Sequence, residues 1–194
     1  MKFRKNIILT DVDGVLLDWE SKFTEWMETK GFRPEPEQYS YEMNLRFGLK
    51  KPHVKELIRQ FNESAWIGFL QPLRDSVEGV RVLHQEKKWR FGAITSLSED
   101  PFATQLRKNN LELIFGEDTF DFVKCIDTGA DKDNELLPYK DSGLYWLEDK
   151  PENALLGADL GLNTILMRHK HNANFYDERI KVVDNWTQIV NTIT

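Results

Sequence analysis

The sequence has a single cysteine, Cys125, and this excludes two ways of holding a small protein together. A lone thiol cannot form a disulfide within the chain, and it cannot supply the several sulfur ligands of a multi-cysteine zinc site. Cys125 lies in the apolar stretch 122–126, and no histidine partner for a catalytic thiol is apparent. We therefore expect this thiol to be buried and unreactive.

A long apolar run and an excess of basic residues are also missing. The first apolar run, residues 7–9, is followed at once by Thr10 and Asp11, so it is too short for a signal sequence or a membrane span. We expect a cytoplasmic protein that does not bind membranes. The formal net charge of −6, without a basic stripe, argues against binding of duplex nucleic acid. An acidic chain can still bind a small phosphate ester, because the local field of a site matters more than total charge.

Internal repeats are absent, and 40% of the 194 residues are apolar, which suits one domain with a modest insertion. Short continuous apolar runs predict strands that are buried on both faces of a parallel sheet. The predicted strands cover residues 7–9, 90–94, 144–147 and 164–167, with a weaker one at 120–126 and a short edge strand at 182–183. Helical patterns lie between these runs, so we expect an α/β fold with a doubly wound, Rossmann-like parallel sheet.

The segment 19–72 interrupts this alternation. It contains two amphipathic helix patterns, whose apolar faces consist of Phe23, Trp26 and Met27 in the first and of Val54, Leu57, Ile58 and Phe61 in the second. The stretch 31–40 between them is rich in proline and glutamate and predicts a loop. We therefore expect a small helical cap at 19–72, inserted after the first strand into an α/β core of residues 1–18 and 73–194.

Two carboxylates, Asp11 and Asp13, directly follow the first predicted strand. Ligands of open α/β sheets bind at the carboxyl ends of strands, and Gly14 permits the sharp turn that lets both side chains face one pocket. Two such carboxylates repel each other unless a cation neutralises them, and hard oxygen ligands suit Mg²⁺. A calcium-binding loop is rejected because Val12 and Val15 stand where that loop needs polar residues.

The segment Asp11-Val12-Asp13-Gly14-Val15 resembles the first motif of the haloacid dehalogenase superfamily, and later motifs of this family follow in order. Thr95 and Ser96 close the second apolar run, where the family has a serine or threonine. Glu148 and Asp149 end the run at 144–147, where the family has an acidic pair. The resemblance covers nearly the whole chain, and it implies a haloacid dehalogenase-like fold with a cap between the first two motifs.

The third and fourth motifs leave alternatives open. The third motif is a lysine shortly before the fourth strand, and we favour Lys132 because it lies near the start of a predicted helix. Lys140 and Lys124 are the competing candidates. The most similar subfamily usually has aspartate where Glu148 stands, so Glu148 is expected to hold a metal either directly or through a bridging water.

The resemblance also implies a mechanism. Asp11 attacks phosphorus and forms an aspartyl phosphate, and Asp13 acts as general acid and then as general base. The implied metal is Mg²⁺, with Asp11, Asp13, Glu148 and Asp149 as the candidate ligands. The implied phosphate-binding residues are Thr95, Ser96 and Lys132. Dehalogenases of this superfamily lack the second aspartate, so the presence of Asp13 favours a phosphatase.

The length, the cap and the motifs are most similar to those of 5′(3′)-deoxyribonucleotidases, which implies a nucleoside or deoxynucleoside 5′-monophosphate as substrate. Trp66, Phe69 and Phe47 are our candidates for contact with a base, although packing explains each aromatic residue more simply. His169 and His171 are interpreted as part of a basic surface loop near the site. The alternatives are a phosphatase of another small ester or of a polynucleotide 3′-phosphate, and a non-catalytic binding protein. The sequence does not indicate an oligomeric state.

Overall fold

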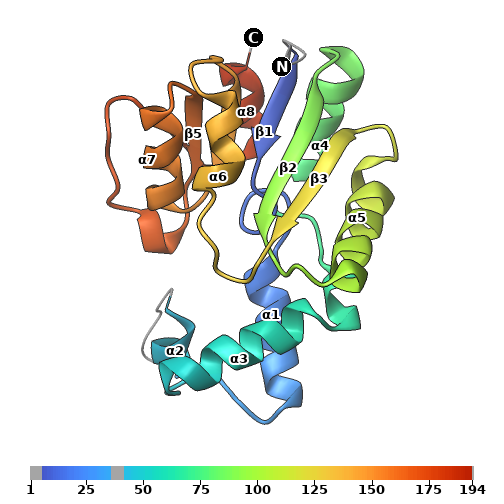
Figure 1. Ribbon diagram of the computed structural model, residues 1–194, viewed down its shortest axis with the longest axis vertical. Helices are drawn as coiled ribbons and strands as arrows, with labels where there is room; N and C mark the ends of the chain where they lie inside the picture. Colours follow the sequence, from blue (N-terminus) through green and yellow to red (C-terminus); the bar gives the residue numbers. More distant parts are fainter. Residues whose placement is uncertain (1–5, 36–41, 194) are drawn as a thin grey trace.

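The computed structural model describes residues 6–35 and 42–193, and its centre is one parallel six-stranded sheet (Figure 1). The strands are β1 (Ile7–Thr10), β2 (Arg90–Ser96), β3 (Phe120–Ile126), β4 (Tyr145–Glu148), β5 (Asn163–Met167) and β6 (Lys181–Val183). Their order is β3-β2-β1-β4-β5-β6, and every neighbouring pair is parallel. The predicted doubly wound sheet is therefore confirmed. The strand order reverses between β1 and β4, and this is where open α/β sheets bind ligands.

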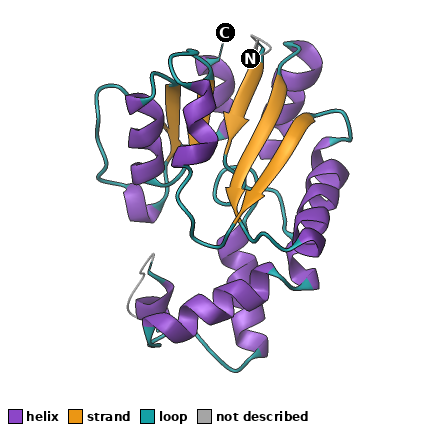
Figure 2. Cartoon of the chain, viewed as in Figure 1, coloured by secondary structure: helices purple, strands orange, loops and turns teal. Residues whose placement is uncertain are grey.

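Helices cover both faces of the sheet (Figure 2). The helices of the core are α4 (Ser76–Arg81), α5 (Pro101–Phe115), α6 (Asp133–Leu136), α7 (Pro151–Asp159) and α8 (Trp186–Thr192). Shorter helical turns are η2 (Val82–Glu86), η3 (Leu137–Tyr139) and η4 (Lys170–Asn172). Successive strand residues point to opposite faces. Ile8 of β1 thus packs in a cluster with Val80 and Trp186, whereas Leu9 packs in another with Leu136.

A second group of helices lies beyond the carboxyl ends of the strands, below the sheet in Figure 1. It consists of α1 (Trp19–Thr29), α2 (Met43–Arg46), α3 (Lys51–Asn62) and the 3₁₀ helix η1 (Ala65–Phe69). The two helices that the amphipathic patterns predict are α1 and α3, and α2 was not predicted. Residues 32–35 of the predicted loop have no regular structure, and residues 36–40 lie outside the described residues.

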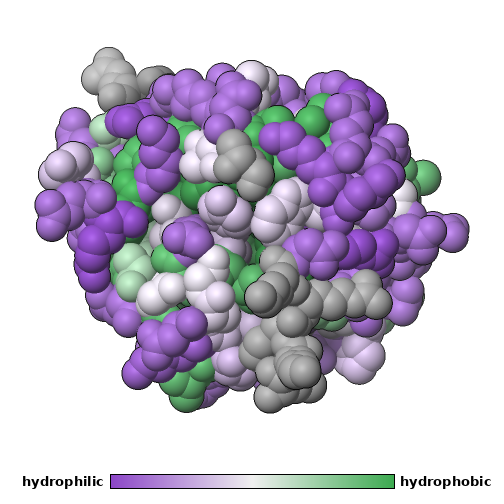
Figure 3. Space-filling view, turned by 90° about the horizontal axis from the view of Figure 1, so that it is seen from above, coloured by the Kyte–Doolittle hydropathy of each residue, from purple (hydrophilic) through white to green (hydrophobic). Residues whose placement is uncertain are grey.

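The two segments that connect the cap to the core lie side by side. Leu17 forms an antiparallel bridge with Pro72, and the main-chain N–H of Asp18 donates to the carbonyl of Gln71 over 2.9 Å. These two contacts lie beside residues 19 and 72, which are the predicted bounds of the cap; the bounds themselves stay a prediction. In the part of the chain that the structure describes, no helix is long and apolar enough to cross a bilayer. Seen from above, at the end of the molecule away from the cap, hydrophilic residues lie around the edge and paler and hydrophobic residues show between them (Figure 3).

Candidate active site

A cleft of about 820 Å³ lies at the carboxyl ends of β1, β2 and β4 and extends to the cap helices α1 and α3. The predicted site residues that line it from the core are Asp11, Asp13, Thr95, Ser96, Lys132, Glu148 and Asp149. The topology explains this convergence, because parallel strands end at the same edge of a sheet. Residues that are far apart in the chain thereby meet in one cavity.

Asp11 directly follows β1, and its position is set by main-chain pairing with β4. Its N–H donates to the carbonyl of Leu147 over 2.8 Å, so the side chain emerges where the two strands end. The N–H of Val12 donates to Asp11 Oδ1 over 2.7 Å, and Lys132 Nζ lies 2.8 Å from Asp11 Oδ2. The carboxylate of Asp11 is thus buried and oriented from two sides.

Of the three candidate lysines, Lys132 is the one that lines the cleft. Its side chain is 1% exposed, and Nζ lies 2.9 Å from Glu148 Oε2 as well as 2.8 Å from Asp11. Burial by itself lowers the pKa of Lys132, but the two carboxylates outweigh it and raise the pKa above its usual value. Lys124 is 52% exposed and lies 3.8 Å from Glu135, and Lys140 is exposed. Neither competing lysine lines the cleft.

Glu148 is fully buried at the end of β4, and both of its carboxylate oxygens have hydrogen-bond partners. Oε2 accepts from Lys132, and Oε1 accepts from the main-chain N–H groups of Asp149 and Lys150 over 3.0 and 3.1 Å. Burial raises the pKa of Glu148, yet the lysine and these N–H groups lower it below its usual value. Glu148 is therefore held as a carboxylate beside Asp149.

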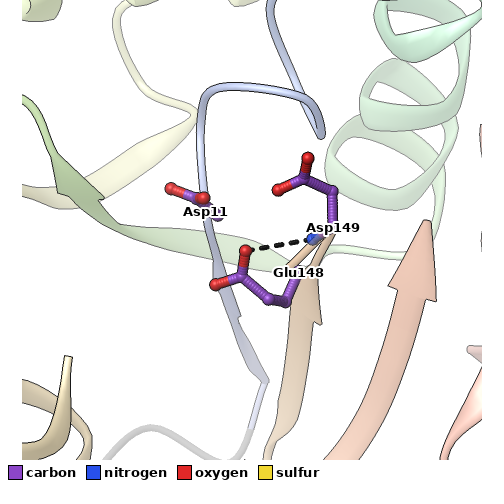
Figure 4. A group of neighbouring side chains, drawn as sticks. All are labelled: Asp11, Glu148 and Asp149. Atoms are coloured by element: carbon purple, nitrogen blue, oxygen red, sulfur yellow. Dashed lines mark hydrogen bonds between the residues drawn. The ribbon is translucent and has the colours of Figure 1, made fainter. Parts of the chain in front are cut away.

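Asp11, Glu148 and Asp149 converge on one point (Figure 4), with one carboxylate oxygen of each within 4.8 Å of the others. Burial and the charge of Glu148 raise the pKa of Asp11 from 3.8 to about 8, although Lys132 opposes the shift. Burial, followed by Glu148 and Asp11, also raises the pKa of Asp149 well above its usual value. Three carboxylates share one ammonium group here, and such a set of buried oxygen donors fits a hard divalent cation such as Mg²⁺.

Gly14 makes room for this convergence. Its backbone has φ +79°, a conformation that residues with a side chain rarely adopt. A Cβ atom at this position would lie 2.3 Å from Asp149 Oδ2. The turn after Asp13 therefore needs glycine for two independent reasons.

Thr95 and Ser96, at the end of β2, differ in what their hydroxyl groups do. Thr95 is 1% exposed, and its Oγ1 has no hydrogen-bond partner among the described residues, although it belongs to the cleft lining. A buried hydroxyl without a partner is costly, so a ligand that bonds to it would be favoured. Ser96 Oγ donates to the carbonyl of Ala130 over 2.8 Å and so tethers the loop that carries Lys132.

Asp13 lines the cleft. Arg107 of α5, which does not line the cleft, donates hydrogen bonds to both oxygens of the Asp13 carboxylate. Arg107 Nη1 lies 2.5 Å from Oδ1, and Nη2 lies 3.1 Å from Oδ2. The sequence analysis missed this arginine. One feature of the sequence could have indicated it. Arg107 lies four residues from both Ala103 and Leu111, so it is on the buried face of α5, where an arginine needs an anionic partner.

His169 and His171 are not a basic surface loop, and that interpretation was wrong. Both rings line the cleft, stacked with centroids 5.5 Å apart. His169 Nε2 lies 2.7 Å from the carbonyl of Gly14, and its Nδ1 faces a nitrogen of Arg74 at 3.3 Å. Because the arginine can only donate, Nδ1 accepts and Nε2 carries the proton. Burial lowers the pKa of both histidines, which favours their neutral forms. His169 thus contacts the turn at Gly14, and His171 Nε2 lies 3.1 Å from the carbonyl of Asp149.

No family model matches the sequence. An uncharacterized 32.4 kDa protein of Enterobacteria phage T4 is 26% identical over 117 residues. This match covers 57% of the chain and 41% of the phage protein, so the chain spans less than half of that relative.

Solved structures match over almost the whole chain. A haloacid dehalogenase-like family hydrolase from Streptococcus pneumoniae has 14% identity and a TM-score of 0.63, and the match covers 97% of this chain and 98% of that one. The protein has the haloacid dehalogenase-like fold. An L-2-haloacid dehalogenase has 16% identity and a TM-score of 0.62, with 97% and 99% of the chains covered. A D,D-heptose 1,7-bisphosphate phosphatase from B. bronchiseptica, complexed with magnesium and phosphate, has 12% identity and a TM-score of 0.61, with 97% of both chains covered.

In this haloacid dehalogenase-like fold, the three aromatic residues of the cap that we predicted for substrate contact do not line the cleft. Phe47 is 5% exposed and packs against Phe23, with ring centroids 6.0 Å apart, so it cannot stack on a substrate. Trp66 is half-buried under Lys22, and Phe69 is 67% exposed; neither lines the cleft. Packing therefore explains Phe47, and none of the three residues lines the cleft in which we predicted that they would contact a base.

Trp19 is the one tryptophan, phenylalanine or tyrosine among the described residues that lines the cleft. One face of its ring stacks on Phe23 with centroids 4.6 Å apart, and its Nε1 donates to Asn62 Oδ1 over 3.0 Å. Asn62 Nδ2 in turn donates to the carbonyl of Leu97 in the core over 2.9 Å. The cap side of the cleft thus contains an aromatic ring whose orientation is fixed by both cap and core.

Proposed function

We propose that the protein is a magnesium-dependent phosphomonoester hydrolase that uses Asp11 as its nucleophile. The observation that carries this proposal is the buried convergence of Asp11, Glu148 and Asp149 around Lys132 at the switch point of the sheet. The unpartnered Thr95 hydroxyl at the same cleft adds a donor for an anionic oxygen. A protein that only bound an anion would gain nothing from a cluster of mutually repelling carboxylates in its cleft.

The reaction has two steps in this proposal. A carboxylate oxygen of Asp11 forms a bond to phosphorus while the bond from phosphorus to the ester oxygen breaks, which leaves an aspartyl phosphate. Asp13 gives its proton to the departing oxygen. It then takes a proton from the water that attacks the phosphorus, and this releases inorganic phosphate and restores Asp11. Lys132 and Thr95 stabilise the charge on the phosphoryl oxygens during both displacements.

Asp11, Asp149 and the main-chain carbonyl of Asp13 would hold Mg²⁺. Glu148 would act on the metal by direct contact or through a bridging water. The bridging water is favoured because Lys132 and two N–H groups already bond to the carboxylate oxygens of Glu148. The ion would offset the negative charges of the substrate and of the carboxylates. The chain's own residues supply the nucleophile, the acid and base, and the orienting cations.

Fold similarity does not select this chemistry, because the similar structures include a dehalogenase as well as a phosphatase. Two features of the chain favour phosphoryl transfer. Asp13 supplies a carboxyl group that lies two residues from the nucleophile and lines the same cleft. The carboxylate cluster calls for a divalent cation, which attack on phosphorus uses to neutralise the anionic oxygens.

The proposed substrates are nucleoside or deoxynucleoside 5′-monophosphates. A cleft of about 820 Å³ is large enough for a molecule of this size. Trp19 offers an aromatic ring for a base, beside apolar Val54 and Ile58 on α3. A sugar phosphate is the main alternative, and it would not need the ring.

Phosphate release from a panel of nucleoside monophosphates and sugar phosphates tests the proposal. We expect release with Mg²⁺, none with EDTA, and a loss of several orders of magnitude for Asp11→Asn. Asp131→Asn is the matched control, because Asp131 is exposed and outside the cleft although it adjoins Lys132. If folded wild-type protein releases no phosphate from any of these esters, the proposed activity on small esters is wrong. Preference for the nucleotides over the sugar phosphates would support the substrate class.

A further inference from the structure

The carboxylate of Asp13 is gripped by a guanidinium group that lies outside the cleft. Arg107 bonds to both oxygens of Asp13, over 2.5 and 3.1 Å, and its side chain is 0% exposed. It makes no other ion pair among the described residues, and its Nε has no hydrogen-bond partner there. Arg107 does not line the cleft, so it does not meet the substrate itself.

Burial of an arginine is expensive unless an anion compensates it. Here the compensating anion is the ionised carboxylate of Asp13. Each of its oxygens has a second lone pair, so the group can still take up and give the proton that the proposed mechanism needs. The planar guanidinium presents two parallel N–H groups, and this fork fixes the plane of a carboxylate in a way that a single ammonium cannot. Asp13 lies 94 positions from Arg107 in the sequence. The two hydrogen bonds therefore form only when α5 is packed against the core beside the turn that carries Asp13.

We propose that Arg107 is the positioning residue of the general acid and base. It holds the carboxyl group of Asp13 so that one oxygen faces the ester oxygen in the first step and the water in the second. This inference rests on the proposed function, and it adds a residue from α5 to the machinery. It predicts that loss of the fork selectively impairs steps that need proton transfer.

Arg107→Lys separates this role from a structural one, because it keeps the charge and removes the fork. We compare kcat/KM for two substrates: the alkyl phosphate that the wild type hydrolyses fastest, and 4-nitrophenyl phosphate. The alkoxide needs a proton as it leaves, whereas 4-nitrophenolate leaves without one. We expect kcat/KM for the alkyl ester to fall about tenfold to hundredfold, a part of the acid–base contribution, and that for the aryl ester to fall less than about threefold.

Asp13→Asn should show the same selective loss, and the double variant should be no worse than Asp13→Asn alone, because both changes remove one interaction. Cys125→Ala is the control for packing between β3 and α5: it perturbs the surroundings of Arg107 and leaves the bonds to Asp13 intact. Equal losses for both esters in Arg107→Lys would overturn the proposal. A wild type that is inactive on both esters would instead overturn the proposed function.

A crystal structure of the wild type with Mg²⁺ and vanadate decides the matter if Arg107→Lys does not fold. Vanadate takes the geometry of the transferring phosphoryl group on Asp11. The proposal requires Asp13 to contact the apical oxygen while it keeps at least one bond to Arg107. An Asp13 side chain that has left Arg107 in this complex would refute it.

Discussion

Asp149 is the least compensated charge of the site. Lys132 forms ion pairs with Asp11 and Glu148, whereas Asp149 has no lysine or arginine within 4.0 Å among the described residues. Its raised pKa reflects burial first and repulsion by the other two carboxylates second. We expect Asp149→Asn to stabilise the metal-free protein at pH 8 by about 1–2 kcal/mol, the scale of the penalty for a buried polar group without a compensating partner. The same change should abolish stabilisation by Mg²⁺.

Urea unfolding in EDTA and in Mg²⁺ measures both effects. Asp131→Asn, an equally small change at an exposed position, should alter the free energy of unfolding by less than about 0.5 kcal/mol. An Asp149→Asn protein that is less stable than the wild type in EDTA would mean that the carboxylate is already satisfied without a metal.

The residues of the site differ in how well their positions could be predicted from the sequence. Asp11 and Asp13 were predicted as site residues because they follow a continuous apolar run, and ligands of open α/β sheets bind at the carboxyl ends of strands. Asp149 was predicted because it and the preceding glutamate resemble the acidic pair of the haloacid dehalogenase family. Arg107 and His169 contact residues 94 and 155 positions away, and no local pattern records such a contact. These contacts became visible only once the chain was folded.

The turn between β1 and α1 depends on a glycine at position 14. Replacement of Gly14 by alanine costs the strain of a positive φ and also places Cβ against Asp149 Oδ2. Gly129 has a similar φ of +72°, yet a Cβ there would meet nothing within 4 Å. Both alanine variants should lose about 1 kcal/mol of stability, but Gly14→Ala alone should also weaken Mg²⁺ binding and lower activity at least about tenfold.

Calorimetry of Mg²⁺ binding and phosphate release on the two variants makes this comparison. If Gly129→Ala lost as much Mg²⁺ affinity as Gly14→Ala, backbone strain alone would account for the effect. The displacement of Asp149 would then have no part in it.

Elements were predictable where their pattern was long or continuous. The six strands and the helices α1 and α3 agree with the apolar runs and amphipathic faces of the sequence. The helix α2 has only four residues, too few for a helical period to show. The aromatic residues of the cap illustrate a related limit: periodicity places Phe23 inside, but it does not say that Phe47 packs beside it while Trp19 reaches the cleft.

At the scale of the molecule, the sequence predicted an α/β core and a helical cap, but it predicted neither the order of the strands nor the contacts between cap and core. Strand order was not predicted, because continuous apolar runs do not state which strand lies beside which. The cleft depends on that order, and also on the link that Asn62 makes between Trp19 of the cap and Leu97 of the core. The core motifs therefore predicted which residues meet at the carboxyl ends of the strands, whereas the cap side of the cleft required the folded chain.

The charge of the site also governs the stability of the whole molecule. The pKa of Asp11 is raised from 3.8 to about 8, so the folded protein binds this proton more tightly than the unfolded chain does. The resulting stabilisation is complete below about pH 4 and is lost as pH rises to about 8, and Asp149 acts in the same direction. Glu148 and the two cleft histidines have lowered pKa values, so their contributions are lost as pH falls. Above pH 7 the two aspartates therefore dominate.

We accordingly expect the metal-free protein to lose about 1 kcal/mol of stability between pH 7 and pH 8.5, which corresponds to release of most of one proton. Mg²⁺ binds the ionised carboxylates, so saturating Mg²⁺ should remove this decline, and the gain in melting temperature from Mg²⁺ should grow with pH. Thermal unfolding at both pH values, in EDTA and in Mg²⁺, measures the effect. Asp11→Asn has no carboxyl to titrate at this position, so its metal-free stability should vary less with pH than that of the wild type. A gain from Mg²⁺ that is equal at the two pH values would mean that the carboxylates are already ionised at pH 7, and that the cation is not what neutralises the cluster.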